Sequence, residues 1–93
     1  MKLDEYRSLA VQMLADADRL ILVHGDPVKL AAVTLTDPTQ CLPTNANDRA
    51  ARVLWSCLCE LYVASQRFQA DSSHGPGELI AAASAIRALF GLR

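Results

Sequence analysis

The segment from Asp48 to Gln69 constrains the fold most strongly, because apolar side chains cover most of its surface. One stripe recurs at spacings of three and four residues, the period of an α-helix, and consists of Ala51, Leu54, Leu58, Leu61, Ser65 and Phe68. Further apolar side chains widen this stripe on both sides, namely Val53, Cys57, Ala64, Trp55, Cys59 and Tyr62. A helix that is apolar over most of its circumference is surrounded by other elements. We therefore expect this segment to be the central helix of a bundle.

Two more main helices are predicted, one on each side of the central segment in the chain. The first begins near Leu3 and stops by Gly25, and its apolar face is formed by Leu3, Tyr6, Ala10, Met13, Ala17 and Leu20. The last runs from about Glu78 to Phe90 and ends at Gly91. Its apolar face is formed by Leu79, Ala82, Ala83, Ile86, Leu89 and Phe90. Its other faces are rich in alanine, which lets helices approach closely.

The stretch between the first and the central helix allows two interpretations. Asp26 and Pro27 are typical of a helix start, which favours a short helix over Val28–Thr36. The alternative is a β-hairpin with strands at Arg19–Val23 and Val28–Thr36, supported by several β-branched residues. We favour the helix. Asp37–Asn47 is expected to be a loop, and the side chain of Asn45 or Asn47 to cap the central helix, with Asp48 in its first turn.

The fold prediction is thus a single all-α domain over residues 1–93. It is a small bundle of three main helices with a short fourth element, a helix or alternatively a β-hairpin, between the first and second. The chain has 93 residues and is 52% hydrophobic, whereas a domain of this size buries only about 60% of the surface that its unfolded chain exposes. The surplus apolar surface predicts contact with another protein and with a second copy, and the expected homo-oligomer is a dimer.

Charge and hydropathy argue against other partners. The formal net charge is -1 and the basic residues form no block, so we do not expect binding to nucleic acid. The apolar runs are far shorter than the roughly 20 residues that span a membrane, and no signal peptide is visible after Lys2. We therefore expect a cytoplasmic protein with no membrane partner. Its three cysteines, Cys41, Cys57 and Cys59, are expected to be reduced thiols.

The potentially reactive side chains do not form a catalytic or metal-binding motif. Cys57 and Cys59 form a C-x-C pair, but residues two apart on a helix point about 200° away from each other and cannot bind one metal ion. His24 and His74 each stand beside a glycine, outside any known nucleophile or zinc signature. We expect both to be solvated loop residues. The sequence therefore predicts no enzyme activity, no catalytic or metal-binding residue and no cofactor.

The remaining candidates are interface residues. Trp55 and Tyr62 are seven residues apart, hence on one helical face, and aromatic side chains anchor interfaces as well as cores. Leu89 and Phe90 end the last helix with large apolar side chains. Two arginines of the central helix, Arg49 and Arg52, share a face that suits phosphate or an acidic partner.

These residues predict a non-enzymatic, self-associating protein-interaction module. The expected type is a small regulator or inhibitor, an antagonist or an assembly subunit of a bacterium or phage. The alternative is an oligomer that binds a small ligand or nucleotide at a subunit interface, near the loop of His24 or of His74. Thermal stabilisation by the right metabolite would distinguish this alternative.

Overall fold

Helices make up most of the described chain. The computed structural model describes residues 1–90, with the backbone alone described for His74. Within these residues, helices α1 to α4 span Leu3–Leu22, Pro27–Ala32, Arg49–Ala70 and Gly77–Phe90, a 3-10 turn η1 spans Ser72–His74, and there is no strand. The predicted all-α bundle is confirmed. The short fourth element is a helix, and the hairpin alternative is wrong.

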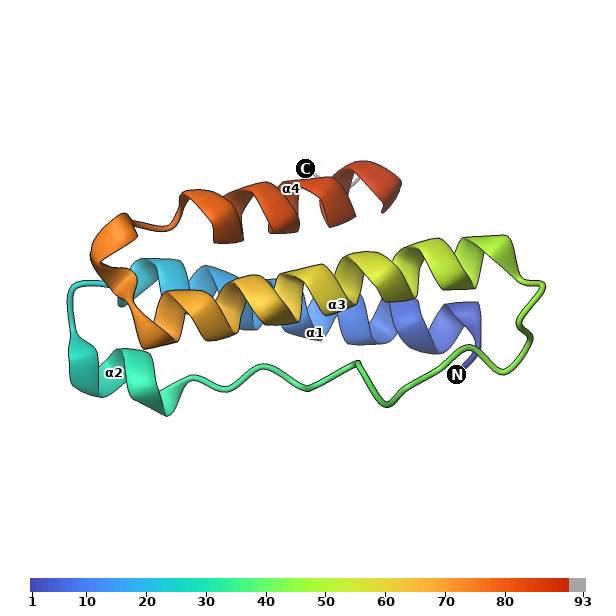
Figure 1. Cartoon of the computed structure of the whole chain (residues 1–93), viewed down its shortest axis with the longest axis horizontal. Helices are drawn as coiled ribbons and strands as arrows, with labels where there is room; N and C mark the ends of the chain where they lie inside the picture. Colours follow the sequence, from blue (N-terminus) through green and yellow to red (C-terminus); the bar gives the residue numbers. More distant parts are fainter. Residues whose placement is uncertain (91–93) are drawn as a thin grey trace.

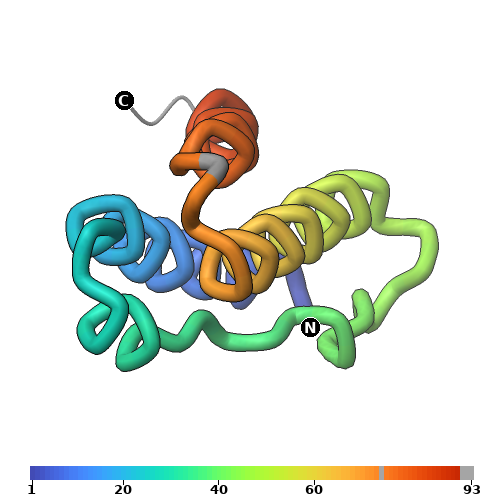
Figure 2. The backbone as a smooth tube through the Cα atoms, turned by 60° about the vertical axis from the view of Figure 1, so that its left-hand side comes forward, coloured from blue at the N-terminus to red at the C-terminus, as the bar shows by residue number. Residues whose placement is uncertain are grey.

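The helices form layers around the pair α1 and α3. These two lie side by side and run in the same direction, so the chain between them must return along the whole length of the pair (Figures 1 and 2). Residues 33–48, which we call the strap, make this return in extended form along one side of the pair. Helix α4 runs back across the opposite side. The α1 and α3 pair is thus covered by the strap on one side and by α4 on the other.

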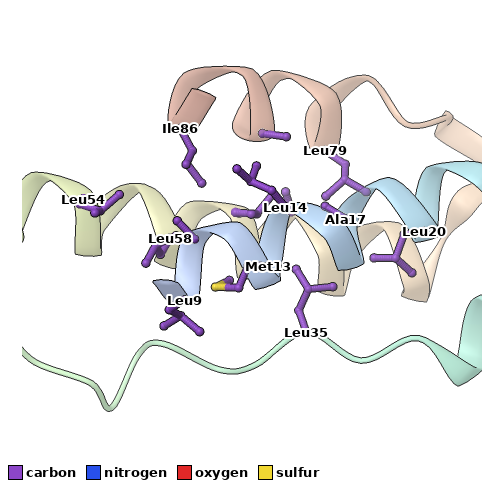
Figure 3. Packing of buried hydrophobic residues seen from close by; sticks show 14 of the residues in the cluster. Leu9, Met13, Leu14, Ala17, Leu20, Leu35, Leu54, Leu58, Leu79 and Ile86 are labelled. Carbon is purple, nitrogen blue, oxygen red and sulfur yellow. The ribbon is translucent and has the colours of Figure 1, made fainter. Parts of the chain in front are cut away.

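The core lies where these layers meet. Leu79 and Ile86 point from α4 towards the α1 and α3 pair, and Leu35 points towards the pair from the strap (Figure 3). The largest fully buried side chains include Tyr6, Met13, Leu20, Leu58, Leu61, Leu79 and Ile86. Burying a side chain of leucine size contributes about 1.5–3 kcal/mol, so this cluster is the main source of stability. Among the helices of residues 1–90, none has both the length and the hydropathy that crossing a bilayer requires.

Helix α2 begins where the sequence predicts and ends earlier. The carboxylate of Asp26 accepts hydrogen bonds from the backbone N–H groups of Val28 and Lys29, at 3.1 and 3.2 Å. The helix ends at Ala32 and not at Thr36, so the predicted end is wrong. The following residues are mostly β-branched and favour extended backbone. Extended backbone also turns Leu35 into the core, where 2% of its surface remains exposed.

The N-cap residue of α3 differs from the prediction. Its N-cap is Asp48, whose carboxylate accepts from the backbone N–H of Ala51 at 3.1 Å, and neither Asn45 nor Asn47 has this role. The side chain of Asn45 instead accepts from the N–H of Asn47 at 2.9 Å, which closes the turn before the helix. Aspartate and asparagine are equally favourable N-cap residues, so the sequence alone did not show which of Asn45, Asn47 and Asp48 caps the helix. The predicted stop of the last helix at Gly91 lies outside the described residues.

Side chains from α1 and α3 hold the strap, because it has no neighbouring strand to satisfy its backbone. The indole Nε1–H of Trp55 donates to the carbonyl oxygen of Pro38 at 2.8 Å, and the hydroxyl of Tyr6 donates to the carbonyl oxygen of Cys41. Buried carbonyl groups that lack a donor are costly, so these bonds stabilise this path of the chain.

The two ends of the crossover are fastened as well. The side-chain amide of Gln69 donates to the carbonyl oxygen of Leu30 at 3.1 Å and also to that of Val33. At the other end, the backbone N–H of Thr44 donates to the carbonyl oxygen of Met1 at 3.0 Å. The strap is therefore held along its whole length, and this side of the α1 and α3 pair is closed.

Candidate protein-interaction surface

Three buried side chains and two ion pairs hold helix α4 against α1 and α3. It turns three buried side chains inward, Leu79, Ala83 and Ile86. The carboxylate of Glu78 pairs with the guanidinium of Arg67 on α3 at 2.8 Å, and Arg87 pairs with Asp18 on α1 at 2.8 Å. Glu78 and Arg87 are the only charged residues of Gly77–Phe90. Both ion pairs lie along the sides of α4, with their side chains partly in solvent.

This side of α4 consists of small residues flanked by larger apolar ones. Four exposed residues, which we call the outer face of α4, follow one another at helical spacing: Ala81, Ser84, Ala85 and Ala88. Ile80 and Leu89 flank them with 45% and 50% of their surfaces exposed. A hollow of about 580 Å³ between α3 and α4 borders this face on one flank and is lined by Val63 and by alanines, but also by Glu60, Arg67 and Glu78. The outer face itself is uncharged, and charged side chains border it on this flank.

A second hollow opens where α4 ends. Helix α3 has 22 residues and α4 has 14, so α3 is about 12 Å longer at 1.5 Å per residue. The first turns of α1 and α3 consequently extend beyond α4 (Figure 1). They form a groove of about 460 Å³, which we call the terminal groove, lined by Leu3, Arg7, Arg49, Ala50, Val53, Leu54, Leu89 and Phe90. It adjoins a hollow of about 360 Å³ that adds the exposed Val11.

The terminal groove combines apolar walls with positive charge. Arg7 lies on the α1 wall and Arg49 on the α3 wall, and no carboxylate is among the lining residues. Arg7 reaches Asp4 only at 3.8 Å, and because both side chains are well exposed this ion pair contributes about 0–1 kcal/mol. Arg49 has no ion-pair partner among residues 1–90. Both guanidinium groups are therefore open to an incoming anion.

The structure brings most of the predicted interface residues to this end of the molecule. Arg49, Leu89 and Phe90 line the terminal groove itself. Arg52 and Trp55 line an adjoining hollow of about 690 Å³, which also includes Arg49. The guanidinium of Arg52 is 3.5 Å from the carbonyl oxygen of Ala46, at the limit of a hydrogen bond.

The two aromatic candidates have a different position. Trp55 is half-buried and uses its indole N–H to hold the strap, so it serves the protein's own fold. Tyr62, on the same helical face, is also half-buried and packs against the core. Neither is an exposed aromatic anchor.

Sequence reasoning missed the contribution of α1 to the groove. Leu3, Arg7 and Val11 are four residues apart, so they form a stripe beside the buried stripe of this helix. This spacing was visible in the sequence. Its meaning depends on the neighbouring ends of α3 and α4, which no local pattern specifies.

Two of the three thiols, Cys41 and Cys59, lie close enough to interact electrostatically, and the described histidine contacts Phe68 instead. Burial, and secondarily the charge of Glu60, raises the pKa of Cys57, and burial is also the main reason that the pKa of Cys59 is raised, so both favour the neutral thiol. The ring of His24 stacks on Phe68 with centroids 6.0 Å apart. Within the described side chains, no three His, Cys, Asp or Glu residues lie close enough to hold a metal ion.

The carboxylates of α1 are also engaged separately. Asp16 pairs with Arg19 on its own helix at 3.5 Å, whereas Asp18 binds Arg87 of α4. Their divergence follows from the helical geometry of residues two apart. These two groups therefore do not act as a carboxylate pair.

Protein-family models, curated proteins and solved structures were each compared with the chain, and none matches it.

Proposed function

We propose that the protein is a non-enzymatic protein-interaction module that associates with itself through the outer face of α4. The observation that carries this proposal is the row of four exposed, uncharged residues on the outer face of α4, beside which Glu78 and Arg87 are paired with neighbouring helices. Half-exposed Ile80 and Leu89 flank that surface. Exposed apolar regions of this kind are typical of protein-protein contacts.

A second copy of the chain is the occupant that suits this face. In a two-fold symmetric contact, residues near the symmetry axis meet their own copies, so a charge at the centre of the contact would face a like charge. The outer face of α4 has no charged side chain, and its alanines allow a second helix to approach closely. Association would bury the half-exposed Ile80 and Leu89 against the other copy, which is favourable.

A module of this type acts by occupying or joining other proteins. We propose the role of a small regulator, inhibitor or antagonist, or of an assembly subunit, of the kind that bacteria and phages encode. Three unpaired cysteines, Cys41, Cys57 and Cys59, support action in a reducing compartment such as the cytoplasm.

The test is the mass of the protein in solution, measured by light scattering after size exclusion at micromolar concentration. We expect twice the 10.1 kDa of one chain. Ala85→Glu places a charge on the outer face of α4 and should give a monomer. The matched control is Ala31→Glu, an exposed alanine on α2 across the molecule, which should remain a dimer. A monomeric wild-type protein, or equal behaviour of the two folded variants, would refute the proposal.

A further inference from the structure

The terminal groove continues a surface that already receives one helix. The α1 and α3 pair holds α4 through inward apolar side chains such as Leu79 and Ile86. Beyond the end of α4 the same pair continues, now lined by Leu3, Ala50 and Leu54 and closed at one end by Phe90. A surface of this shape and chemistry suits the apolar face of another helix.

The charged residues of the groove indicate which side chains such a helix carries beside its apolar face. Arg7 and Arg49 come from opposite walls, so a helix lying in the groove would have a guanidinium on each side of its apolar face. The nearest carboxylates leave these charges available, because Asp48 caps α3 and Asp4 lies 3.8 Å from Arg7 with both side chains in solvent. Arginine matches carboxylate geometry well and holds it by charge-assisted hydrogen bonds.

We infer that the terminal groove binds an amphipathic helix of a partner protein whose apolar face is bordered by aspartate or glutamate. This inference rests on the proposed function, since it names a partner for the same module, but apart from Leu89, which borders both surfaces, it uses other residues than self-association does. A nucleic acid would pair with the two arginines and leave the apolar walls of the groove in water. A helix with acidic borders satisfies both features at once.

The experiment measures fluorescence anisotropy of two labelled, helix-stabilised peptides on the wild-type protein. Both carry leucines at every third or fourth position, and the border residues are glutamate in one peptide and lysine in the other. We expect the glutamate peptide to bind at least about tenfold more tightly, because like charges facing each other are strongly unfavourable. Equal binding of the two peptides, or no binding of the glutamate peptide, would overturn the inference.

Charge reversal locates the site. The double variant Arg7→Glu/Arg49→Glu should lose the glutamate peptide about tenfold or more and gain the lysine peptide. Both positions are exposed, and glutamate in the first turn of α3 is favourable for the helix, so the variant should fold. The matched control Arg19→Glu/Lys29→Glu makes the same change in net charge at exposed positions outside the groove. If both double variants respond equally, general electrostatics explains the binding and the groove does not.

Two further arms separate this inference from other partners and from the proposed function. Duplex DNA and vesicles of phosphatidylglycerol should not compete with the glutamate peptide, and competition by either would replace the helix as the occupant. Ala85→Glu should bind the glutamate peptide with unchanged affinity. If Ala85→Glu remains a dimer and the peptide binds, self-association through α4 is wrong while the groove assignment stands. If Ala85→Glu is a monomer and the wild-type protein does not bind the peptide, self-association through α4 stands and the groove assignment is wrong.

Discussion

The indole Nε1–H of Trp55 donates a 2.8 Å hydrogen bond to the carbonyl oxygen of Pro38, seventeen residues earlier in the chain. Pro38 is itself buried, and its carbonyl accepts both from this indole and from the backbone N–H of Cys41 at 3.0 Å. The bond joins the strap to α3 in the middle of the crossover. A residue that looks like an interface anchor in the sequence therefore stabilises the path of the chain between α1 and α3.

Replacing this donor should lower stability without disturbing self-association. We expect Trp55→Phe to lower the free energy of unfolding by about 0.5–1.5 kcal/mol, because the carbonyl of Pro38 loses one of its two donors and keeps only the backbone N–H of Cys41. Urea denaturation followed by circular dichroism measures this change. The control Tyr62→Phe should change stability by less than about 0.5 kcal/mol, because the hydroxyl of Tyr62 makes no hydrogen bond within residues 1–90. If Trp55→Phe were folded but monomeric, the face of α3 that carries Trp55 and Tyr62 would be the dimer interface instead of α4.

Stability should fall at high pH because of Tyr6. Burial, and to a lesser extent the neighbouring Cys41, raises the pKa of this phenol above its ordinary value near 10. The folded state then holds the phenolic proton more tightly than the unfolded state does. The resulting stabilisation is complete below pH about 10 and is lost as the pH rises through the pKa of the folded protein.

The difference between wild type and Tyr6→Phe isolates this effect, since other titrating groups are common to both. The variant also removes the donor to the carbonyl of Cys41, which costs about 1 kcal/mol at neutral pH. We expect the gap in unfolding free energy between the two proteins to narrow above pH 10 in urea titrations. A gap that is constant from pH 8 to pH 11 would contradict this assignment.

The capping residues of α3 make a local prediction. Asp48→Ala should destabilise the protein by about 0.5–2 kcal/mol, because the N–H of Ala51 loses its acceptor. Asn47→Ala is the control and should change stability by less than about 0.5 kcal/mol, since the side chain of Asn47 does not cap the helix. Thermal unfolding by circular dichroism distinguishes the two, and the reverse order would show that the helix starts one residue earlier.

Substitutions of the two isoleucines on α4 test which side of this helix faces the core. Ile86 is fully buried, so Ile86→Ala should cost about 2–5 kcal/mol of unfolding free energy. Ile80 is 45% exposed, so Ile80→Ala should cost less than about 1 kcal/mol and should weaken self-association instead. Chemical denaturation together with sedimentation equilibrium measures both quantities. Equal losses of stability would mean that α4 is rotated about its axis, so that Ile80 and Ile86 are buried to the same extent.

Interaction should not depend on the histidine at the end of α1. His24 is exposed and stacks on Phe68, so His24→Ala should cost about 0.5–1.5 kcal/mol of stability at most. We expect its dimer and its affinity for the glutamate peptide to equal those of the wild type. A folded His24→Ala that had lost both would favour the ligand-binding alternative.

The spacing of apolar residues in the sequence determined which segments are helical and which side of each is buried. Local chemistry also placed some helix ends, as at Asp26, because a cap involves only neighbouring residues. For α2 the same local reasoning failed at its end, where burial of Leu35 favours extended backbone. The helical period of apolar residues shows that one face of a helix is covered, but it does not show which other element covers that face.

Tertiary structure alone decided what covers each face. The parallel arrangement of α1 and α3 and the course of the strap depend on bonds between distant residues, such as Tyr6 to Cys41, thirty-five positions apart. The terminal groove exists because α4 ends before the helices beneath it, which brings Arg7 and Arg49 to opposite walls. Such a site is a property of three chain segments in space. No local pattern encodes it, because each segment satisfies its own helical period whether or not the others lie beside it.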